Sequence, residues 1–141
     1  MNIVIMSKYK LYTDGGARGN PGPAGIGGVL YDSENNIVGD FSVYLGVATN
    51  NQAEYKALLR GLELAKEKKI EDLECYLDSE LVVKQLKREY KVKNKDLAIL
   101  FVKAWNLSMG FKNISFNHVR REYNKVADAL ANEAMDAGTK L

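Results

Sequence analysis

The order of apolar and polar residues in the first third of the chain predicts three strands on short connections. Residues 8–14 alternate, with Tyr9, Leu11 and Thr13 on one side, as is typical of a half-buried strand. Seven of the chain's 12 glycines and both of its prolines then fall between Gly15 and Gly28, and this density of turn residues predicts a loop. The three strands are expected at residues 8–14, 26–31 and 37–46, and their order predicts an antiparallel meander.

After residue 50 the apolar residues recur every three or four positions, which predicts helices separated by single strands. Asn50 or Asn51 is suited to cap the first helix, and Ser79 the second. The first helix is expected to run from that cap through residue 69, and the second to follow Ser79 and carry Leu81, Val82, Val83 and Leu86. The other helices are expected at about 96–109 and at 125–137, with Gly138 ending the last, and the strands at 73–78 and 114–119. In the third helix we expect an inner face of Leu97, Leu100, Phe101, Ala104 and Trp105. The order of elements predicts an α/β fold, a five-stranded mixed sheet flanked by helices whose later strands are parallel.

Length and composition narrow the class of protein. A chain of 141 residues predicts a single domain with its own core, and 46% apolar with 27% charged residues excludes disorder, collagen and coiled coils. One cysteine and one histidine exclude an internal disulfide and a zinc site of the Cys/His type. The sequence has no run of 18 apolar residues, and residues 1–6 lack the charged start of a signal peptide, so we expect no membrane span and a cytoplasmic location.

Positive charge is concentrated in one part of the sequence. Residues 84–125 contain 11 Lys and Arg against three acidic residues, a net charge of +8, whereas the rest of the chain carries −6. This asymmetry favours a polyanionic partner such as nucleic acid. It is equally typical of lysines on solvated helix surfaces, so charge alone leaves both interpretations open.

Four carboxylates fall at positions that the pattern places toward the inside: Asp14, Glu54, Asp78 and Asp128. Each alone has a structural explanation, as a turn residue, a helix cap or a charge near a helix N-terminus. Four converging carboxylates, however, would repel one another unless they were protonated or bound to cations. Mg²⁺ is the natural counter-ion for such oxygen ligands, and a pair of ions suits phosphodiester displacement. His118, the sole histidine, lies ten residues before Asp128 and could transfer protons or help product leave.

An ordered set of motifs resembles type 1 ribonuclease H, and the likeness spans the chain from about Tyr9 to Ala137. The motifs are Tyr12-Thr13-Asp14-Gly15-Gly16, Asn20-Pro21-Gly22-Pro23-Ala24-Gly25, Thr49-Asn50-Asn51-Gln52-Ala53-Glu54, Asp78-Ser79, His118 and Asp128. The resemblance implies a five-stranded mixed sheet with flanking helices. It also implies hydrolysis of the RNA strand of RNA–DNA hybrids, dependent on Mg²⁺ or Mn²⁺, with 5′-phosphate and 3′-hydroxyl products.

Carried over by position, the resemblance assigns roles to individual residues. Asp14, Glu54, Asp78 and Asp128 would bind two metal ions and catalyse, and His118 would assist turnover. Substrate contacts would come from Asn20, Asn50, Asn51, Gln52 and, beside the third carboxylate, Ser79. Amide side chains both donate and accept hydrogen bonds, which suits them to the 2′-hydroxyl that distinguishes RNA from DNA.

The sequence also departs from some members of this family. Their extra basic helix carries tryptophans that grip the DNA strand, but residues 87–95 here are short and contain no tryptophan. Some compact relatives cut double-stranded RNA, so that activity stays open. We expect a monomer that binds RNA–DNA hybrid and no membrane. Two alternatives are a hybrid-binding module that has lost catalysis and a nuclease of the same broad fold that acts on DNA.

Overall fold

The computed structural model describes residues 8–140. Residues 1–6, on which the expectation of no signal peptide rests, lie outside the described part. The strands are β1 (Tyr9–Ala17), β2 (Gly22–Tyr31), β3 (Ile37–Ala48), β4 (Asp72–Leu77) and β5 (Asn113–His118). The helices are α1 (Asn50–Glu67), α2 (Glu80–Leu86), α3 (Lys95–Ser108) and α4 (Lys125–Thr139), with a 3-10 turn, η1, at Arg121–Tyr123. None of the described helices is both long enough and apolar enough to cross a membrane.

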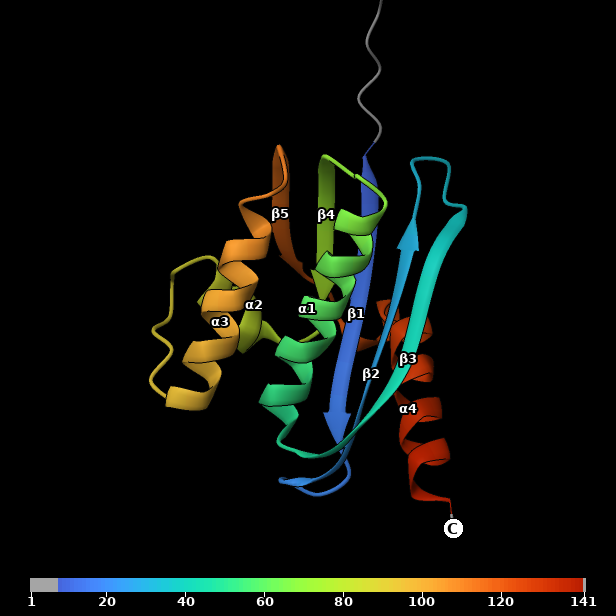
Figure 1. The fold of residues 1–141 in the computed structure, drawn as a ribbon, viewed down its shortest axis with the longest axis vertical. Coiled ribbons are helices and arrows are strands. Elements are labelled where there is room, and N and C mark those ends of the chain that lie inside the picture. The colour runs from blue at the N-terminus through green and yellow to red at the C-terminus, as the bar shows by residue number, and fades with distance from the viewer. Residues whose placement is uncertain (1–7, 141) are drawn as a thin grey trace, which may run out of the picture.

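The five strands form one mixed sheet in the order β3-β2-β1-β4-β5 (Figure 1). The first three strands pair antiparallel, and β1, β4 and β5 pair parallel, as the sequence predicts. Because parallel strands share a direction, the C-terminal ends of β1 and β4 meet at one edge of the sheet. Asp14 lies near that end of β1, and Asp78 comes directly after β4.

Helices cover the sheet unequally on its two faces. Helices α1 and α3 pack side by side on one face, and α4 packs on the other, against β1, β2 and β3 (Figure 1). The larger core cluster lies under α1 and α3, where Leu11, Leu58, Leu62 and Leu73 are almost fully buried. Alternation along β1 therefore sends odd-numbered side chains such as Leu11 toward α1 and even-numbered ones toward the opposite face.

The loop predicted from the glycine-rich stretch is wrong. Strand β1 continues to Ala17 and β2 begins at Gly22, so only residues 18–21 form the turn. The glycines serve close packing of helices on strands instead. A Cβ atom at Gly15 would overlap the main-chain carbonyl of Ala53 in α1, and one at Gly25 would lie 2.7 Å from the carbonyl oxygen of Ala131 in α4. Both helices can therefore approach the sheet only where it has no side chains.

Helix boundaries and one helix face also differ from the predictions. Thr49, and not Asn50 or Asn51, caps α1. Its hydroxyl accepts from the Gln52 N–H and the Gln52 side chain accepts from the Thr49 N–H, which together form a capping box. Ser79 caps α2 as expected. Helix α4 continues through Gly138, where a Cβ atom would overlap the Tyr44 ring. Trp105 is 37% exposed and so does not belong to the inner face of α3.

We expect Gly27→Ala to destabilise the protein by about 1–3 kcal/mol, because a methyl group has no room beneath α4. The new Cβ atom would lie 2.5 Å from the main-chain nitrogen of Ala131. Gly16→Ala is the matched control, since its nearest neighbours would be 3.9 Å away, an ordinary contact. Urea unfolding measures both effects, and equal stability of the two variants would contradict this account of the glycines.

Candidate metal and catalytic site

Three of the four predicted carboxylates meet at the C-terminal ends of β1 and β4. One oxygen atom from each of Asp14, Glu54 and Asp78 lies within 4.8 Å of the others. Asp14 and Glu54 are 7% and 8% exposed, and Asp78 is half-buried. Carboxylates so close together and so poorly hydrated destabilise one another when ionised.

Each carboxylate is placed by a different element of the fold. Asp14 lies within β1, where it pairs with Gly27 of β2. Glu54 lies in the second turn of α1 and reaches the sheet because Gly15 lets the helix backbone approach. Asp78 occupies the junction between β4 and α2, next to the Ser79 cap. The cluster thus depends on long-range packing and not on one local motif.

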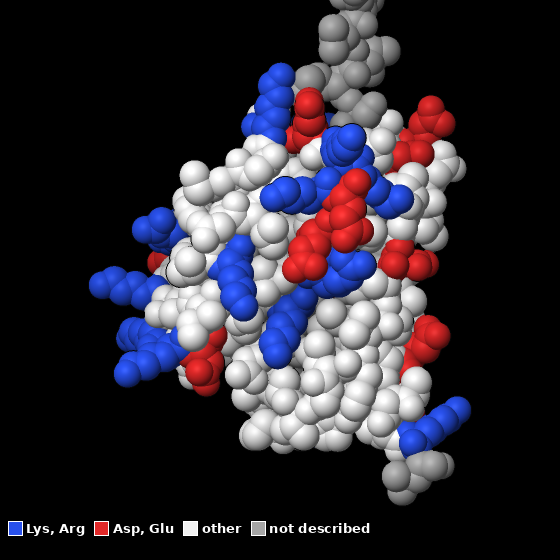
Figure 2. Space-filling model, viewed as in Figure 1, with Lys and Arg blue, Asp and Glu red and all other residues white. Residues whose placement is uncertain are grey.

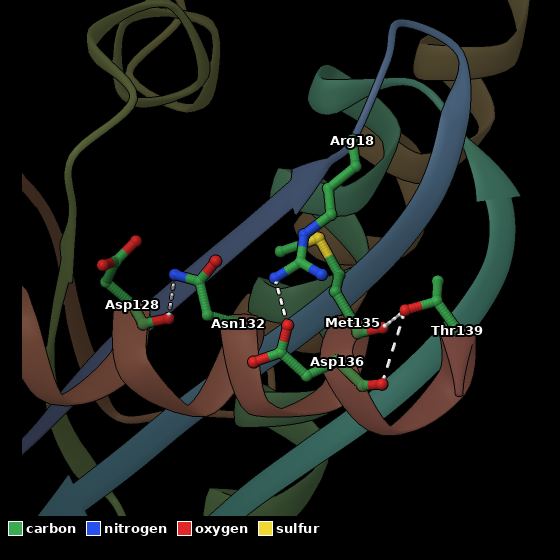
Figure 3. Close-up of polar contacts among 6 residues, drawn as sticks. All are labelled: Arg18, Asp128, Asn132, Met135, Asp136 and Thr139. Atoms are coloured by element: carbon green, nitrogen blue, oxygen red, sulfur yellow. Dashed lines mark hydrogen bonds and ion pairs between the residues drawn. The ribbon is translucent and has the colours of Figure 1, made fainter. Parts of the chain in front are cut away.

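Asp128 comes to the same site from α4. It lies in the first turn of that helix and lines a cavity of about 440 Å³ together with the other three carboxylates. Figure 3 shows the face of α4 that carries Asp128, Asn132 and Met135, all of which line this cavity. The Asn132 side chain donates to the Asp128 main-chain oxygen at 3.0 Å. The structure therefore brings all four predicted carboxylates to one cavity, with Asp128 outside the tightest group.

The electrostatics of the cluster follow from burial and mutual repulsion. Burial, and after it the charge of Asp78, raises the pKa of Asp14 to about 7. Burial also raises the pKa of Glu54 well above its usual value, and the charges of Asp14 and Asp78 add to this effect. Without a cation, the folded state therefore holds protons on these two carboxyl groups more tightly than the unfolded chain does.

The donor atoms fit a hard divalent cation. All the converging ligands are carboxylate oxygens, which Mg²⁺ and related ions prefer. The Glu54 Oε2 atom is buried and has no hydrogen-bond partner among the described residues. A buried carboxylate oxygen without a partner is costly, and coordination of a cation would remove that cost.

The predicted substrate-contact residues border the carboxylates. Asn50, Asn51 and Ser79 line the same cavity. Asn20, Asn51 and Gln52 line a neighbouring cavity of about 250 Å³, so Asn51 lies between the two. All five side chains therefore line either the carboxylate cavity or the cavity beside it.

His118 is placed differently from the carboxylates. It is the exposed last residue of β5, and the described residues that line the carboxylate cavity do not include it. Arg121, three residues further along in η1, lines the cavity instead. The expected role of His118 in turnover therefore stays a prediction.

Sequence reasoning missed Asn124, which links the site to the sheet. Asn124 is 1% exposed, and its Nδ2 atom donates to the Thr13 main-chain oxygen at 2.9 Å and to the Asp78 Oδ2 atom at 3.1 Å. An asparagine before a helix normally suggests an N-cap, but this side chain makes no capping bond to α4. Only the tertiary fold shows that it holds Asp78.

Two other contacts position the edges of the cavity. Arg18, in the β1–β2 turn, lines the cavity and pairs with Asp136 of α4 at 2.6 Å (Figure 3). On the other side, the Asn50 Oδ1 atom accepts from the Ala17 N–H at 2.8 Å. These contacts join the end of β1 to both α4 and α1, the helices that supply Asp128 and Glu54.

Comparisons with known proteins agree with this geometry. The family model described as "Reverse transcriptase-like" matches residues 12–134. Ribonuclease HI of Halobacterium salinarum is 47% identical over 125 residues, which cover 89% of this chain and 63% of that protein. The bifunctional protein Rv2228c of Mycobacterium tuberculosis is 41% identical over 134 residues, 94% of this chain and 37% of that protein. The chain thus spans less than two thirds of the length of either relative.

Solved structures are similar over nearly the whole chain. The N-terminal RNase H domain of Rv2228c superposes with a TM-score of 0.90 at 42% identity, covering 92% of this chain and 94% of that one. LC11-RNase H1 in complex with an RNA/DNA hybrid gives a TM-score of 0.89 at 45% identity, covering 94% and 99%. The fold described above is therefore the fold of these proteins.

The raised pKa values predict how stability depends on pH when no divalent cation is present. Because the folded state holds protons on Asp14 and Glu54 more tightly than the unfolded chain does, the free energy of unfolding should fall as pH rises from about 4 through about 7. Asp14→Asn should weaken this dependence and raise the free energy of unfolding by about 1–3 kcal/mol at about pH 8.

Urea unfolding in EDTA across this pH range measures the effect. Asp40→Asn is the control, because Asp40 is an exposed carboxylate on β3 outside the cavity. It should change stability by less than about 0.5 kcal/mol. A metal-free protein whose stability is constant or rises over this range would show that the carboxylates do not repel as described.

Proposed function

The chain belongs to the ribonuclease H family, and we propose that it is a metal-dependent endoribonuclease that hydrolyses the RNA strand of RNA–DNA hybrids. The observation that carries the proposal is the meeting of the Asp14, Glu54 and Asp78 carboxylates at one cavity. The structural relative LC11-RNase H1, 45% identical, is itself in complex with an RNA/DNA hybrid. We assign the activity to a single catalytic domain and expect 5′-phosphate and 3′-hydroxyl products.

We assign metal binding to Asp14, Glu54, Asp78 and Asp128, with Mg²⁺ as the ion and Mn²⁺ as a substitute. When bound, a pair of such ions supplies Lewis-acid stabilisation of the charge on the attacking and leaving oxygens of a phosphodiester. The chain's own part is to hold the carboxylates in place before substrate arrives. The bond from Asn124 to Asp78 and the close approach of α1 at Gly15 both serve this purpose.

Recognition of RNA is assigned to the amide side chains beside the cavity. The Oδ1 atoms of Asn20 and Asn50 and the Oε1 atom of Gln52 accept from main-chain N–H groups. These bonds fix the orientation of each amide. Within residues 8–140 the NH₂ groups of these three side chains make no hydrogen bond, so they can donate to a 2′-hydroxyl or a base edge in the minor groove.

Surface charge supports a polyanionic substrate. Figure 2 shows Lys and Arg side chains projecting from the side of the molecule formed by α3 and the loop before it. Lys91, Lys93, Lys95 and Lys103 in this region are all exposed. In contrast, α1 carries both signs of charge in the same view (Figure 2). Basic side chains near a nuclease site bind phosphates without reading sequence.

A cleavage assay tests the proposed activity. RNA–DNA hybrid, double-stranded RNA, double-stranded DNA and single-stranded RNA, each end-labelled, are incubated with Mg²⁺, Mn²⁺ or EDTA. We expect metal-dependent cleavage of the RNA strand of the hybrid and a loss of about 10³-fold or more in Asp14→Asn, which removes a ligand at the centre of the cluster. Asp40→Asn, the same chemical change on β3, should leave the rate unchanged.

Each other result has a definite meaning. Cleavage of double-stranded RNA as well would extend the substrate range without changing the site. Binding of hybrid without any cleavage, indifferent to Mg²⁺, would identify a binding module that has lost catalysis. Hydrolysis of the all-DNA duplex would favour a DNA nuclease of the same fold, and wild-type activity in Asp14→Asn would contradict the assigned site.

His118→Ala tests the role in turnover. Because His118 is exposed at the end of β5, we propose that it assists product departure and not the folding of the site. Steady-state cleavage should fall by about tenfold, with a smaller change in single-turnover cleavage. Rapid-quench kinetics separate the two rates. Equal loss in both would place His118 in the chemical step instead.

A further inference from the structure

A second cavity, separate from the carboxylate site, lies between the sheet and the start of α4. Its volume is about 340 Å³, within the range of small-molecule sites, about 300–1,000 Å³. None of the described residues that line it also lines the carboxylate cavity. Three tyrosines and two lysines are prominent in its wall: Tyr12, Tyr31, Tyr123, Lys10 and Lys125.

Two of these tyrosines, Tyr12 and Tyr31, belong to a row of aromatic rings on the sheet face opposite α1. The ring of Tyr12 meets Tyr31 of β2 edge to face, with centroids 5.8 Å apart and planes at 88°. On its other side it stacks on Tyr76 of β4, with centroids 4.8 Å apart and planes at 14°. Tyr123 is 69% exposed at the entrance. Both sides of the Tyr12 ring are thus covered, and Tyr31 and Tyr123 are the rings that can contact a planar base of any identity.

The cavity also suits an anion. Lys10 and Lys125 line it against one carboxylate, Glu122, among its described lining residues. Helix α4 begins here, and no side chain caps its first turn, so its leading N–H groups lack partners within the helix. The Asn124 side chain, which also lines the cavity, is 1% exposed and keeps its Oδ1 atom without a hydrogen-bond partner in the described structure. This oxygen is an acceptor with almost no accessible surface, so anion binding falls to the lysines and the helix N–H groups.

We propose that this cavity binds a nucleoside 5′-monophosphate, either free or at the end of a nucleic acid strand. Tyr31 and Tyr123 contact the base, and Lys10, Lys125 and the N-terminus of α4 bind the phosphate. A purely apolar ligand would leave both lysines unused, and a bare phosphate would leave the aromatic row unused. The binding needs no divalent ion, so it stands apart from the proposed cleavage.

A titration of the unsubstituted protein with adenosine 5′-monophosphate in EDTA, followed by NMR of the backbone amides, tests the site. We expect saturable shifts confined to the residues that line the cavity, with a dissociation constant of about 0.1–1 mM. Lys125→Glu and Tyr123→Ala should each weaken binding by about tenfold. Both side chains are exposed, so neither substitution threatens the fold. Lys66→Glu, the same charge reversal at an exposed position of α1 that lines neither cavity, should leave binding unchanged.

Three further ligands identify the chemistry that is recognised. Adenosine and inorganic phosphate should each bind more weakly than the nucleotide. A short single-stranded RNA with a 5′-phosphate, compared with the same strand lacking it, distinguishes a strand end from a free nucleotide as the preferred source. The proposal is overturned if the nucleotide does not saturate the protein, if phosphate alone binds equally well, or if Lys66→Glu weakens binding as much as Lys125→Glu does.

Discussion

Mutual repulsion among the carboxylates of Asp14, Glu54 and Asp78 is the constraint that the rest of the structure must balance. One oxygen atom of each lies within 4.8 Å of the others, and two of the three side chains are almost fully buried. Ionised carboxylates this close repel one another and so destabilise the folded state, and contacts between sequence neighbours alone would not hold them together. The apolar core beneath α1 and α3 supplies the opposing free energy, and a bound cation would convert the repulsion into coordination.

The remainder of the fold can be understood as the means of holding that cluster. Glycines in β1 and β2 let α1 and α4 approach the sheet closely enough for Glu54 and Asp128 to reach the end of β1. Asn124 joins β1 to Asp78, so the start of α4 is tied to two strands at once. Because the Asn124 side chain makes these bonds, it does not cap the first turn of α4, which lies beside the cavity lined by Tyr12, Tyr31 and Tyr123. Two neighbouring sites thus share one structural residue.

Sequence reasoning was accurate where periodicity and burial coincide, and it failed where tertiary contacts decide. The order of strands and helices, and the convergence of four carboxylates, followed from alternation and from acidic residues in apolar patterns. The glycine-rich stretch was misinterpreted as a loop, because glycine that permits close packing cannot be told from glycine that permits a turn. Asn124 was missed for a similar reason, since its partners are 111 and 46 residues away in sequence.

The most direct test of this account is the number of protons released when a divalent cation binds. Calorimetric titration of Mg²⁺ or Mn²⁺ into the metal-free protein, in two buffers of different ionisation enthalpy, measures that number together with the affinity. Because burial and neighbouring carboxylates raise the pKa of Asp14 to about 7 and that of Glu54 above its usual value, binding should release protons and tighten as pH rises. Saturable binding without proton release, or no binding at all, would contradict the account.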